Sequence, residues 1–281
     1  MVRTQRYRAI VAYDGTAYGG FQVQANRPTI QGELERALGS ATQAFVRVVG
    51  AGRTDAGVHA LGQVISFEAG WRHGLAALQR AMNALLPDDI VVRELEPADE
   101  RFHARFSARR RTYRYWVYHS PSGQPLLWRY AWRLGRRPDV GAMRGASERL
   151  LGEHDYAAFG QAPCGTNTVR TVKRAEWRRR EAPPWAGDGV DLWEFEIAAN
   201  AFLRGMVRRV VGTLLLVGSG ELSVDGFAEV LASRDPARSG PPAPARGLTL
   251  WRVEYEEVGC AWRVRGAHQE PEGTTTLPPG Q

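Results

Sequence analysis

The chain of 281 residues is long enough for one large domain or two modest ones. Hydrophobic residues make up 43% and charged residues 24% of the sequence, a composition that excludes fibrous and disordered proteins. The formal net charge is +7, and Lys173 is the only lysine, so arginine supplies almost all of the positive charge. Guanidinium groups bind phosphate and stack on bases, which favours a nucleic-acid partner, although a bias toward arginine codons would produce the same excess.

Cysteine content and hydropathy predict a cytoplasmic protein. Cys164 and Cys260 are the only cysteines, and they lie too far apart in sequence for a disulfide scaffold or a zinc knuckle. No run of about 18 apolar residues occurs, which excludes a membrane-spanning helix. The N-terminal apolar stretch is too short for a signal peptide, so we expect a reducing compartment and no membrane.

The first half of the chain predicts a mixed α+β unit. Alternation over residues 6–13 indicates a strand, and the Asp-Gly-Thr that follows supplies a turn. After Thr29, a candidate N-cap, apolar residues recur every three or four positions up to Ala41, which indicates an amphipathic helix. We expect further strands at 46–49, 63–67 and 90–95, and a helix at 75–86.

The second half roughly repeats this order of strands and helices, which predicts two similar α+β domains, at 1–105 and 106–258. A polar tail at 259–281 has almost no apolar content, so we expect it to be disordered. The expected elements of the second half are strands at 112–119, 168–177, 193–198 and 248–255, helices at 140–151 and 201–217, and a loop at 235–244.

Motifs for cofactors and metals fail in this sequence. The glycines at Gly50 and Gly52 lead to Asp55 where a dinucleotide loop needs its third glycine, and no P-loop occurs. A His-x-Glu at 268–270 lies in the tail without the Pro-Cys-x-x-Cys that would complete a deaminase zinc site. We therefore expect neither a cofactor nor a metal.

Asp55 is the candidate catalytic residue, in a loop between two apolar strands. Taken alone, Thr54 and Asp55 would more often cap a turn. However, Arg53, Thr54 and His59 place further polar groups around Asp55. Because burial without a partner raises a carboxyl pKa and weakens the nucleophile, such a site requires a cation, and Arg208 is our candidate.

The predicted helix at 201–217 carries that arginine. Its apolar stripe leaves Arg204 and Arg208 together on another face, where their repulsion favours an anionic partner. The alternative is a solvated basic face. The stripe consists of Phe202, Met206, Val210 and Leu214.

Residues 101–119 combine arginines such as Arg105 with aromatic rings, a pattern that suits RNA because arginine can hold the backbone and aromatic rings can stack on bases. Tyr113, Tyr115 and Val117 also alternate as an ordinary strand face, so most of these rings are expected in the core. One ring that reaches the site would be enough.

Several segments, in order over residues 7–255, resemble the TruA family of tRNA pseudouridine synthases. The sequence departs from that family at Phe21, where tryptophan is usual, and at Gly205, where a bulkier residue is common. The segments are YDGTAYGGFQVQ from Tyr13, TIQGELERAL from Thr29, GAGRTDAGVHALGQV from Gly50, NALLP from Asn83, FHARFSA from Phe102 and NAFLRGMVRRVVG from Asn200.

The resemblance implies a pseudouridine synthase fold: two ferredoxin-like α+β domains related by a pseudo-twofold, sharing a central antiparallel sheet, with the active cleft between them. It implies a homodimer that isomerises uridine to pseudouridine at positions 38, 39 and 40 in the anticodon arm of tRNA, without a cofactor. Asp55 would be the nucleophile, Tyr113 the ring against the target uracil and Arg208 the partner of Asp55. The remaining expected substrate and RNA contacts are Arg53, His59, Arg105 and Arg204.

Two other functions stay open at this point. One is a non-catalytic module that binds or folds tRNA on the same architecture, and the other is an enzyme of this fold that acts on another RNA. The sequence also leaves three reaction routes open, namely attack on the sugar, a glycal intermediate and addition at uracil C6.

Overall fold

The structure is a computed structural model that describes residues 4–163 and 165–256. Both cysteines, the His-x-Glu at 268–270 and the tail at 259–281 for which we expected disorder lie outside the described residues. None of the described helices combines the length and the apolar character that a membrane crossing requires.

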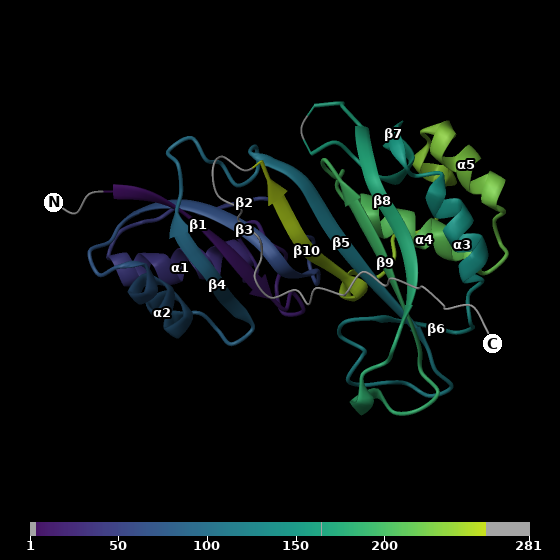
Figure 1. Cartoon of the computed structure of the whole chain (residues 1–281), viewed down its shortest axis with the longest axis horizontal. Helices are drawn as coiled ribbons and strands as arrows, with labels where there is room; N and C mark the ends of the chain where they lie inside the picture. The colour runs from purple at the N-terminus through teal and green to yellow at the C-terminus, as the bar shows by residue number, and fades with distance from the viewer. Residues whose placement is uncertain (1–3, 164, 257–281) are drawn as a thin grey trace, which may run out of the picture.

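One large, mostly antiparallel sheet runs through the molecule in the strand order β4-β1-β3-β10-β5-β9-β8-β7, with β2 paired to β3 and β6 paired to β5 (Figure 1). This confirms the predicted α+β class. The strands are β1 (Thr4–Tyr13), β2 (Val49–Gly50), β3 (His59–Gly70), β4 (Ile90–Pro97), β5 (Ala108–His119), β6 (Trp132–Leu134), β7 (Gly152–Asp155), β8 (Val169–Arg180), β9 (Asp191–Ala199) and β10 (Leu248–Tyr255).

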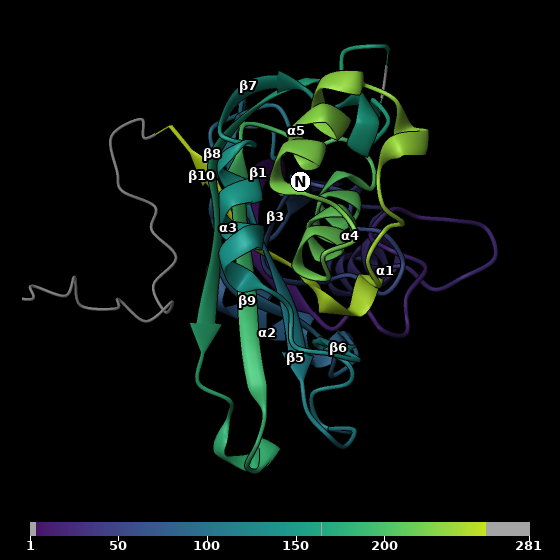
Figure 2. The same ribbon diagram turned by 90° about the vertical axis from the view of Figure 1, so that its right-hand side faces the viewer.

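Helices from both halves of the chain pack against this sheet. In the second half, α3 contacts β8, α4 and α5 (Figure 2). The helices are α1 (Ile30–Thr42), α2 (Leu75–Leu85), α3 (Val140–Glu148), α4 (Met206–Gly218) and α5 (Val224–Ser233), and four short 3-10 turns are η1 (Ala157–Phe159), η2 (Pro184–Ala186), η3 (Pro236–Arg238) and η4 (Ala245–Gly247).

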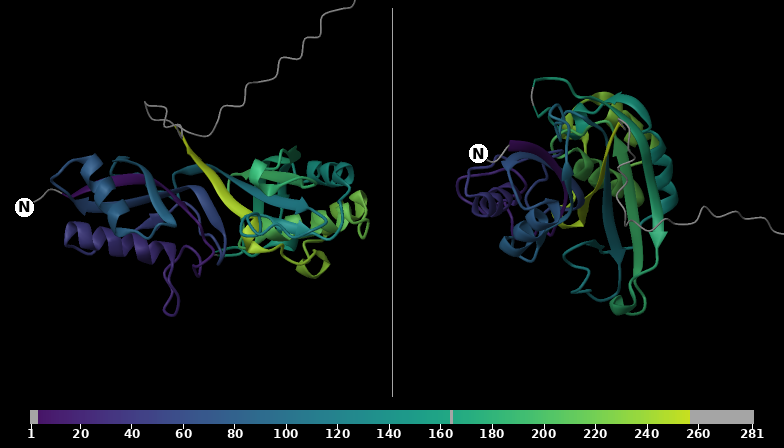
Figure 3. Two further views of the ribbon diagram at one scale, coloured as in Figure 1. Left: turned by 90° about the horizontal axis from the view of Figure 1, so that it is seen from below. Right: turned by 60° about the vertical axis from the view of Figure 1, so that its left-hand side comes forward.

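The strand order repeats between the halves of the chain. The first half gives β4-β1-β3-β2, and the second gives β10-β5-β9-β8. The first half has the element order β-α-β-β-α-β, and the second follows it with β6, β7 and α5 added. The final strand, β10, joins them, because it pairs with β5 and also runs parallel to the start of β3, at His59 and Ala60. The halves lie end to end on either side of β10 (Figure 3). The division into two domains at residue 105 stays a prediction.

Several predicted elements are confirmed. The strand at the N-terminus and the helix from Ile30 form as expected, and the Thr29 side chain accepts a hydrogen bond from the Gly32 backbone N–H at the start of α1. The strand predicted at 46–49 is reduced to Val49–Gly50. The sequence analysis did not predict β6, β7 and α5.

The prediction for α4 was wrong at its start. The helix begins at Met206 rather than at residue 201, because Gly205 has a φ of 74°, in the left-handed region that interrupts a helix. Phe202 and Arg204 therefore precede the helix, and Arg204 instead forms a backbone bridge with Gln161. The expected shared helix face of Arg204 and Arg208 does not exist.

A small lobe projects from the ends of β5, β8 and β9. It consists of the loop 120–131 and the connection 181–190 (lower part of Figure 1). A satellite hydrophobic cluster holds these two segments together, separate from the main core. Its buried members are Tyr118, Leu127, Ala131, Ala186 and Leu192.

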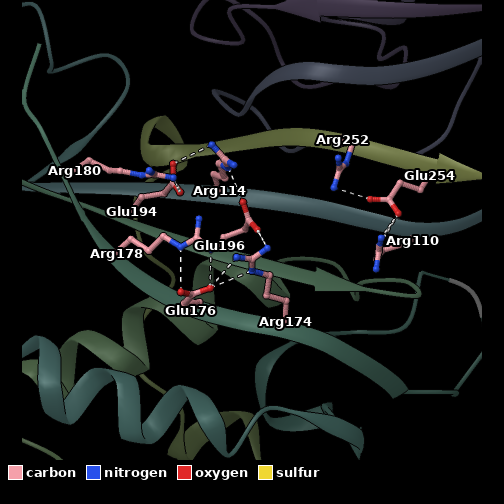
Figure 4. Close-up of polar contacts among 10 residues, drawn as sticks. All are labelled: Arg110, Arg114, Arg174, Glu176, Arg178, Arg180, Glu194, Glu196, Arg252 and Glu254. Atoms are coloured by element: carbon pink, nitrogen blue, oxygen red, sulfur yellow. Dashed lines mark hydrogen bonds and ion pairs between the residues drawn. The ribbon is translucent and has the colours of Figure 1, made fainter. Parts of the chain in front are cut away.

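Charged side chains form a network on one face of the sheet in the second half (Figure 4). Successive residues of a strand point to opposite faces, so Phe195 packs against Trp177 in the core while Glu194 and Glu196 join the network. Glu194 is fully buried among the longer arginine side chains. The network has two parts: Arg110 and Arg252 both pair with Glu254, and ion pairs link Arg114, Arg174, Glu176, Arg178, Arg180, Glu194 and Glu196.

Candidate active site

The loop 51–58 between β2 and β3 carries Asp55, and β3 fixes the start of that loop. The Gln63 amide is fully buried, and it donates to the Gly52 carbonyl oxygen at 2.7 Å and accepts from the Gly52 N–H at 3.2 Å. The Ala51 N–H donates to the Val64 carbonyl at 2.8 Å. The Gln63 side chain therefore holds both the N–H and the carbonyl group of Gly52.

Thr54, next to Asp55, is anchored from the opposite side. Its buried hydroxyl lies 2.8 Å from the Tyr13 hydroxyl, and its carbonyl accepts from the Phe21 N–H at 3.0 Å. A Cβ atom on Gly20, which has a φ of 107°, would lie only 2.7 Å from that carbonyl oxygen. Glycine at this position thus permits the close approach of the 13–21 segment to the Asp55 loop.

Asp55 and Arg208 meet as the sequence predicted. Nη1 of Arg208 lies 3.3 Å from Oδ2 of Asp55, and the two side chains are 22% and 36% exposed. Arg208 comes from the first turn of α4, and its Nε donates to the Ala243 carbonyl at 2.7 Å, which fixes the direction of the guanidinium. The ion pair joins the first half of the chain to the second while leaving the carboxylate accessible.

Tyr113 lies in the middle of β5, where it pairs with Leu250 of β10 and Ile197 of β9. Its ring is nearly buried and meets the Phe202 ring edge-on, with centroids 5.1 Å apart. A Cβ atom on Gly52 would lie 3.5 Å from its hydroxyl oxygen, so the phenol borders the Asp55 loop. Burial raises the pKa of Tyr113 to about 12; the charge of Arg111 opposes that shift and the charge of Asp55 adds to it.

Arg111 holds three segments around the site, and sequence analysis did not single it out. The side chain is buried and makes four hydrogen bonds, all to carbonyl oxygens: two to Ala51 at 3.2 and 2.9 Å, one to Asn200 at 2.9 Å and one to Arg105 at 2.7 Å. Burial lowers its pKa. It is one of a run of arginines in the sequence, and nothing in that run distinguishes it.

His59 has a structural environment. The ring is buried, and its Nδ1 lies 3.1 Å from the Gly15 backbone nitrogen and 3.1 Å from Oδ1 of Asp14. Nε2 lies 3.0 Å from the Arg129 carbonyl oxygen and 3.1 Å from that of Arg246. Both nitrogens are thus occupied by protein groups, which favours a role in joining β3 to two loops over the expected RNA contact.

The other three predicted contacts differ in their surroundings. Arg53 and Arg204 are exposed, and neither side chain forms an ion pair or hydrogen bond within the described residues. Arg105 is partly buried, with its guanidinium 5.5 Å from the centroid of the Phe106 ring. Arg53 is the only one of the three in the Asp55 loop, and the expected RNA contacts of all three stay predictions.

Within the part of the chain that the structure describes, no group of three or more His, Cys, Asp or Glu residues could hold a metal ion. The side chains at the site offer the Asp55 carboxyl group, the Arg208 guanidinium, and the Tyr113 phenol, which keeps its proton at neutral pH. This set is suited to nucleophilic and acid–base chemistry on a ligand bound between the halves of the chain.

The chain belongs to the tRNA pseudouridine synthase family, whose sequence model matches residues 9–107 and 146–256, and it is accordingly an isomerase. Within the family it is similar to proteins named tRNA pseudouridine synthase A. The protein of Chloroflexus aurantiacus is 47% identical over 269 residues, which cover 95% of this chain and 94% of the relative. That of Roseiflexus castenholzii is 44% identical, with 89% and 91% covered, and that of Geobacillus kaustophilus is 43% identical, with 90% and 96% covered.

Proposed function

We propose that this protein isomerises uridine to pseudouridine at positions 38, 39 and 40 in the anticodon stem-loop of tRNA, with Asp55 as the nucleophile. The observation that carries the proposal is the ion pair between Asp55 and Arg208, at 3.3 Å, in a loop that the family match covers. The name that the relatives share, tRNA pseudouridine synthase A, supports tRNA as the substrate.

The reaction breaks the N1–C1′ glycosidic bond, turns the uracil and forms a C5–C1′ bond. The C5 proton is lost and N1 gains one, so the product is an isomer and no oxidant or reductant takes part. The Asp55 carboxylate is suited to bonding to C1′ while the base turns and to leaving when C5 attacks. Arg208, itself held by the Ala243 carbonyl, orients that carboxylate.

The target base must leave its stack to reach Asp55, which costs a few kcal/mol. Contact with the Tyr113 ring would offset about 1–3 kcal/mol of this. Phe202 supports that ring from its edge. Because the pKa of Tyr113 is raised to about 12, we assign the residue a positioning contact through its ring rather than a role as a phenolate base.

The proposed site lies between two domains, with Asp55 in the first and with Tyr113 and Arg208 in the second. We also propose a homodimer that grips one tRNA and a cytoplasmic location. These rest on the family resemblance and on the charge of +7, which suits a phosphate backbone.

Replacing Asp55 by asparagine tests the nucleophile. Asp55→Asn keeps the size of the side chain and removes the charge, so we expect turnover to fall at least about a thousandfold, equal to about 4 kcal/mol of activation free energy, while tRNA affinity stays within about threefold. Mass spectrometry after carbodiimide labelling would locate pseudouridine in tRNA transcripts. The matched control is Asp188→Asn, at an exposed loop position.

Wild-type protein should place pseudouridine at positions 38, 39 and 40 and nowhere else in the transcript. Substantial product from Asp55→Asn would contradict the assigned nucleophile. Binding of tRNA by wild-type protein without any release of the C5 proton would instead support the non-catalytic RNA-binding module. Pseudouridine formed only in another RNA would support an enzyme of this fold that acts on that RNA.

A further inference from the structure

The projecting lobe exposes a patch of large apolar side chains. Trp128 is 54% exposed, Leu126 is 63% exposed and Tyr130 is 45% exposed. Single exposed apolar residues are ordinary, but three within five positions form a patch, and such patches mark interaction sites. The Arg246 guanidinium lies 5.2 Å from the centroid of the Trp128 ring.

The backbone of the lobe holds Trp128 firmly. The Trp128 N–H donates to the Gln124 carbonyl at 3.0 Å, and the Ala131 N–H donates to the Leu127 carbonyl at 2.9 Å. Leu127, directly before the tryptophan, is buried in the satellite cluster of the lobe. An exposed ring on a fixed backbone loses little conformational entropy when a ligand stacks on it.

A short segment connects this patch to the proposed active site. Arg208, the partner of Asp55, donates to the Ala243 carbonyl, and three residues later Arg246 reaches the Trp128 ring. The His59 ring holds the two segments that form the patch, since its Nε2 contacts the Arg129 carbonyl next to Trp128 and the carbonyl of Arg246. The patch therefore lies beside the Asp55 loop.

The chemistry of the patch fits single-stranded RNA. An indole offers a stacking surface to any base, and neighbouring arginines can bind the adjoining phosphates. The Arg129 side chain is 60% exposed, and the Nε of Arg246 is buried without a hydrogen-bond partner among the described residues. The family match stops at residue 107 and resumes at 146, so it does not cover the lobe loop that carries Trp128.

We propose that Trp128 and Arg246 form a second RNA subsite, at which an unpaired base near the target uridine stacks on the indole while Arg246 binds its phosphate. This proposal rests on the proposed function, because it takes the anticodon loop as the source of the unpaired base. The subsite holds substrate and contributes no reacting group.

Kinetics of tryptophan variants test the stacking contact. We expect Trp128→Ala to lower kcat/KM for tRNA transcripts about tenfold through KM, with kcat nearly unchanged, and Trp128→Phe to recover most of the loss. The matched control is Trp185→Ala, which removes an equally exposed tryptophan, at 55%, from the other segment of the lobe. Thermal unfolding of each variant verifies that the lobe remains folded.

Equal KM values for Trp128→Ala and wild type would overturn the subsite, as would an equal loss in Trp185→Ala. Either result leaves the proposed function intact, because wild-type turnover is measured in the same experiment. Wild-type protein that makes no pseudouridine would instead contradict the proposed function. In that case, filter binding of the anticodon stem-loop by wild type and Trp128→Ala still tests the subsite.

The phosphate contact has a separate measurement. Arg246→Gln should reduce the slope of log Kd against log salt concentration by about 1, the value expected for the loss of one phosphate contact. Arg149→Gln is the control, since Arg149 is an exposed arginine at the end of α3 that pairs with Asp225. An unchanged slope in Arg246→Gln would exclude the assigned phosphate contact.

Discussion

Arg111 is a buried cation whose hydrogen bonds all go to backbone carbonyls of three separate segments. An arginine usually pairs with a carboxylate when it is buried, because removing the charge from water is costly. Here the carbonyl dipoles compensate, and in return the guanidinium joins the Asp55 loop to the segment before α4. Both sides of the proposed site therefore depend on one buried side chain whose hydrogen bonds go to the protein backbone.

Arg111→Met should lower the free energy of unfolding by about 3 kcal/mol, because three carbonyl groups lose a charged donor. Denaturant unfolding measures the change. The neighbouring Arg109→Met is the control, because the Arg109 side chain is 64% exposed and, among the described residues, pairs with the exposed Glu256 alone. Equal stability of the two variants would mean that water replaces the guanidinium without loss.

Sequence analysis predicted the contact between Asp55 and Arg208 and missed the residues that hold their surroundings in place. Asp55 and Arg208 were paired because chemistry requires a cation beside a buried carboxylate. Gln63 holds Gly52 in the loop that precedes its strand, and Arg111 holds carbonyls of segments up to 89 positions away. No local pattern encodes these side-chain contacts. Gln63 did leave a signal, since it is a polar residue at the start of an apolar strand.

At the scale of elements, Gly205 determines where α4 begins and so where Arg208 points. The periodicity of apolar residues continues back to Phe202, which is why the sequence predicted a longer helix. Periodicity does not report backbone dihedrals, and because Gly205 has a φ of 74° the helix starts only at the next residue, Met206. The family resemblance already marked this glycine as a departure.

Gly205→Ala should destabilise the protein by about 1 kcal/mol, because alanine disfavours the left-handed region. No atom lies within 4 Å of the position a Cβ would take, so the effect comes from the backbone alone. Thermal unfolding would detect the shift. Gly135→Ala provides the control, since that site is equally open and has no positive φ; a similar change in both variants would contradict this account.

At the scale of the whole molecule, the charged sheet face limits how much of the positive charge is available to RNA. Many of its arginines are neutralised by glutamates on neighbouring strands, as with Arg114, which contacts both Glu194 and Glu196 (Figure 4). Burial raises the pKa of Glu194, and the charges of Arg114 and Arg180 oppose that shift. Phosphate contacts must come largely from other arginines.

We expect log Kd for tRNA to rise with log salt concentration with a slope of about 2 or more, because each duplex phosphate contact releases close to one counterion. Fluorescence anisotropy of labelled tRNA would measure Kd at several salt concentrations from about 50 to 200 mM, a range in which salt screens phosphate contacts appreciably. The value of kcat at saturating tRNA should not change. A flat profile would count against a protein that grips the tRNA backbone.

The central place of β10 in the sheet has a consequence for how the protein folds during synthesis. This strand is the last that the structure describes, yet it lies between β3 and β5 and, among the described strands, it alone joins the halves. The chain must therefore be synthesised as far as residue 255 before the sheet can close. Contacts this distant in sequence form slowly. Because the Ala243 carbonyl, just before β10, accepts from Arg208, we expect the pair of Asp55 and Arg208 to take its final geometry late in folding.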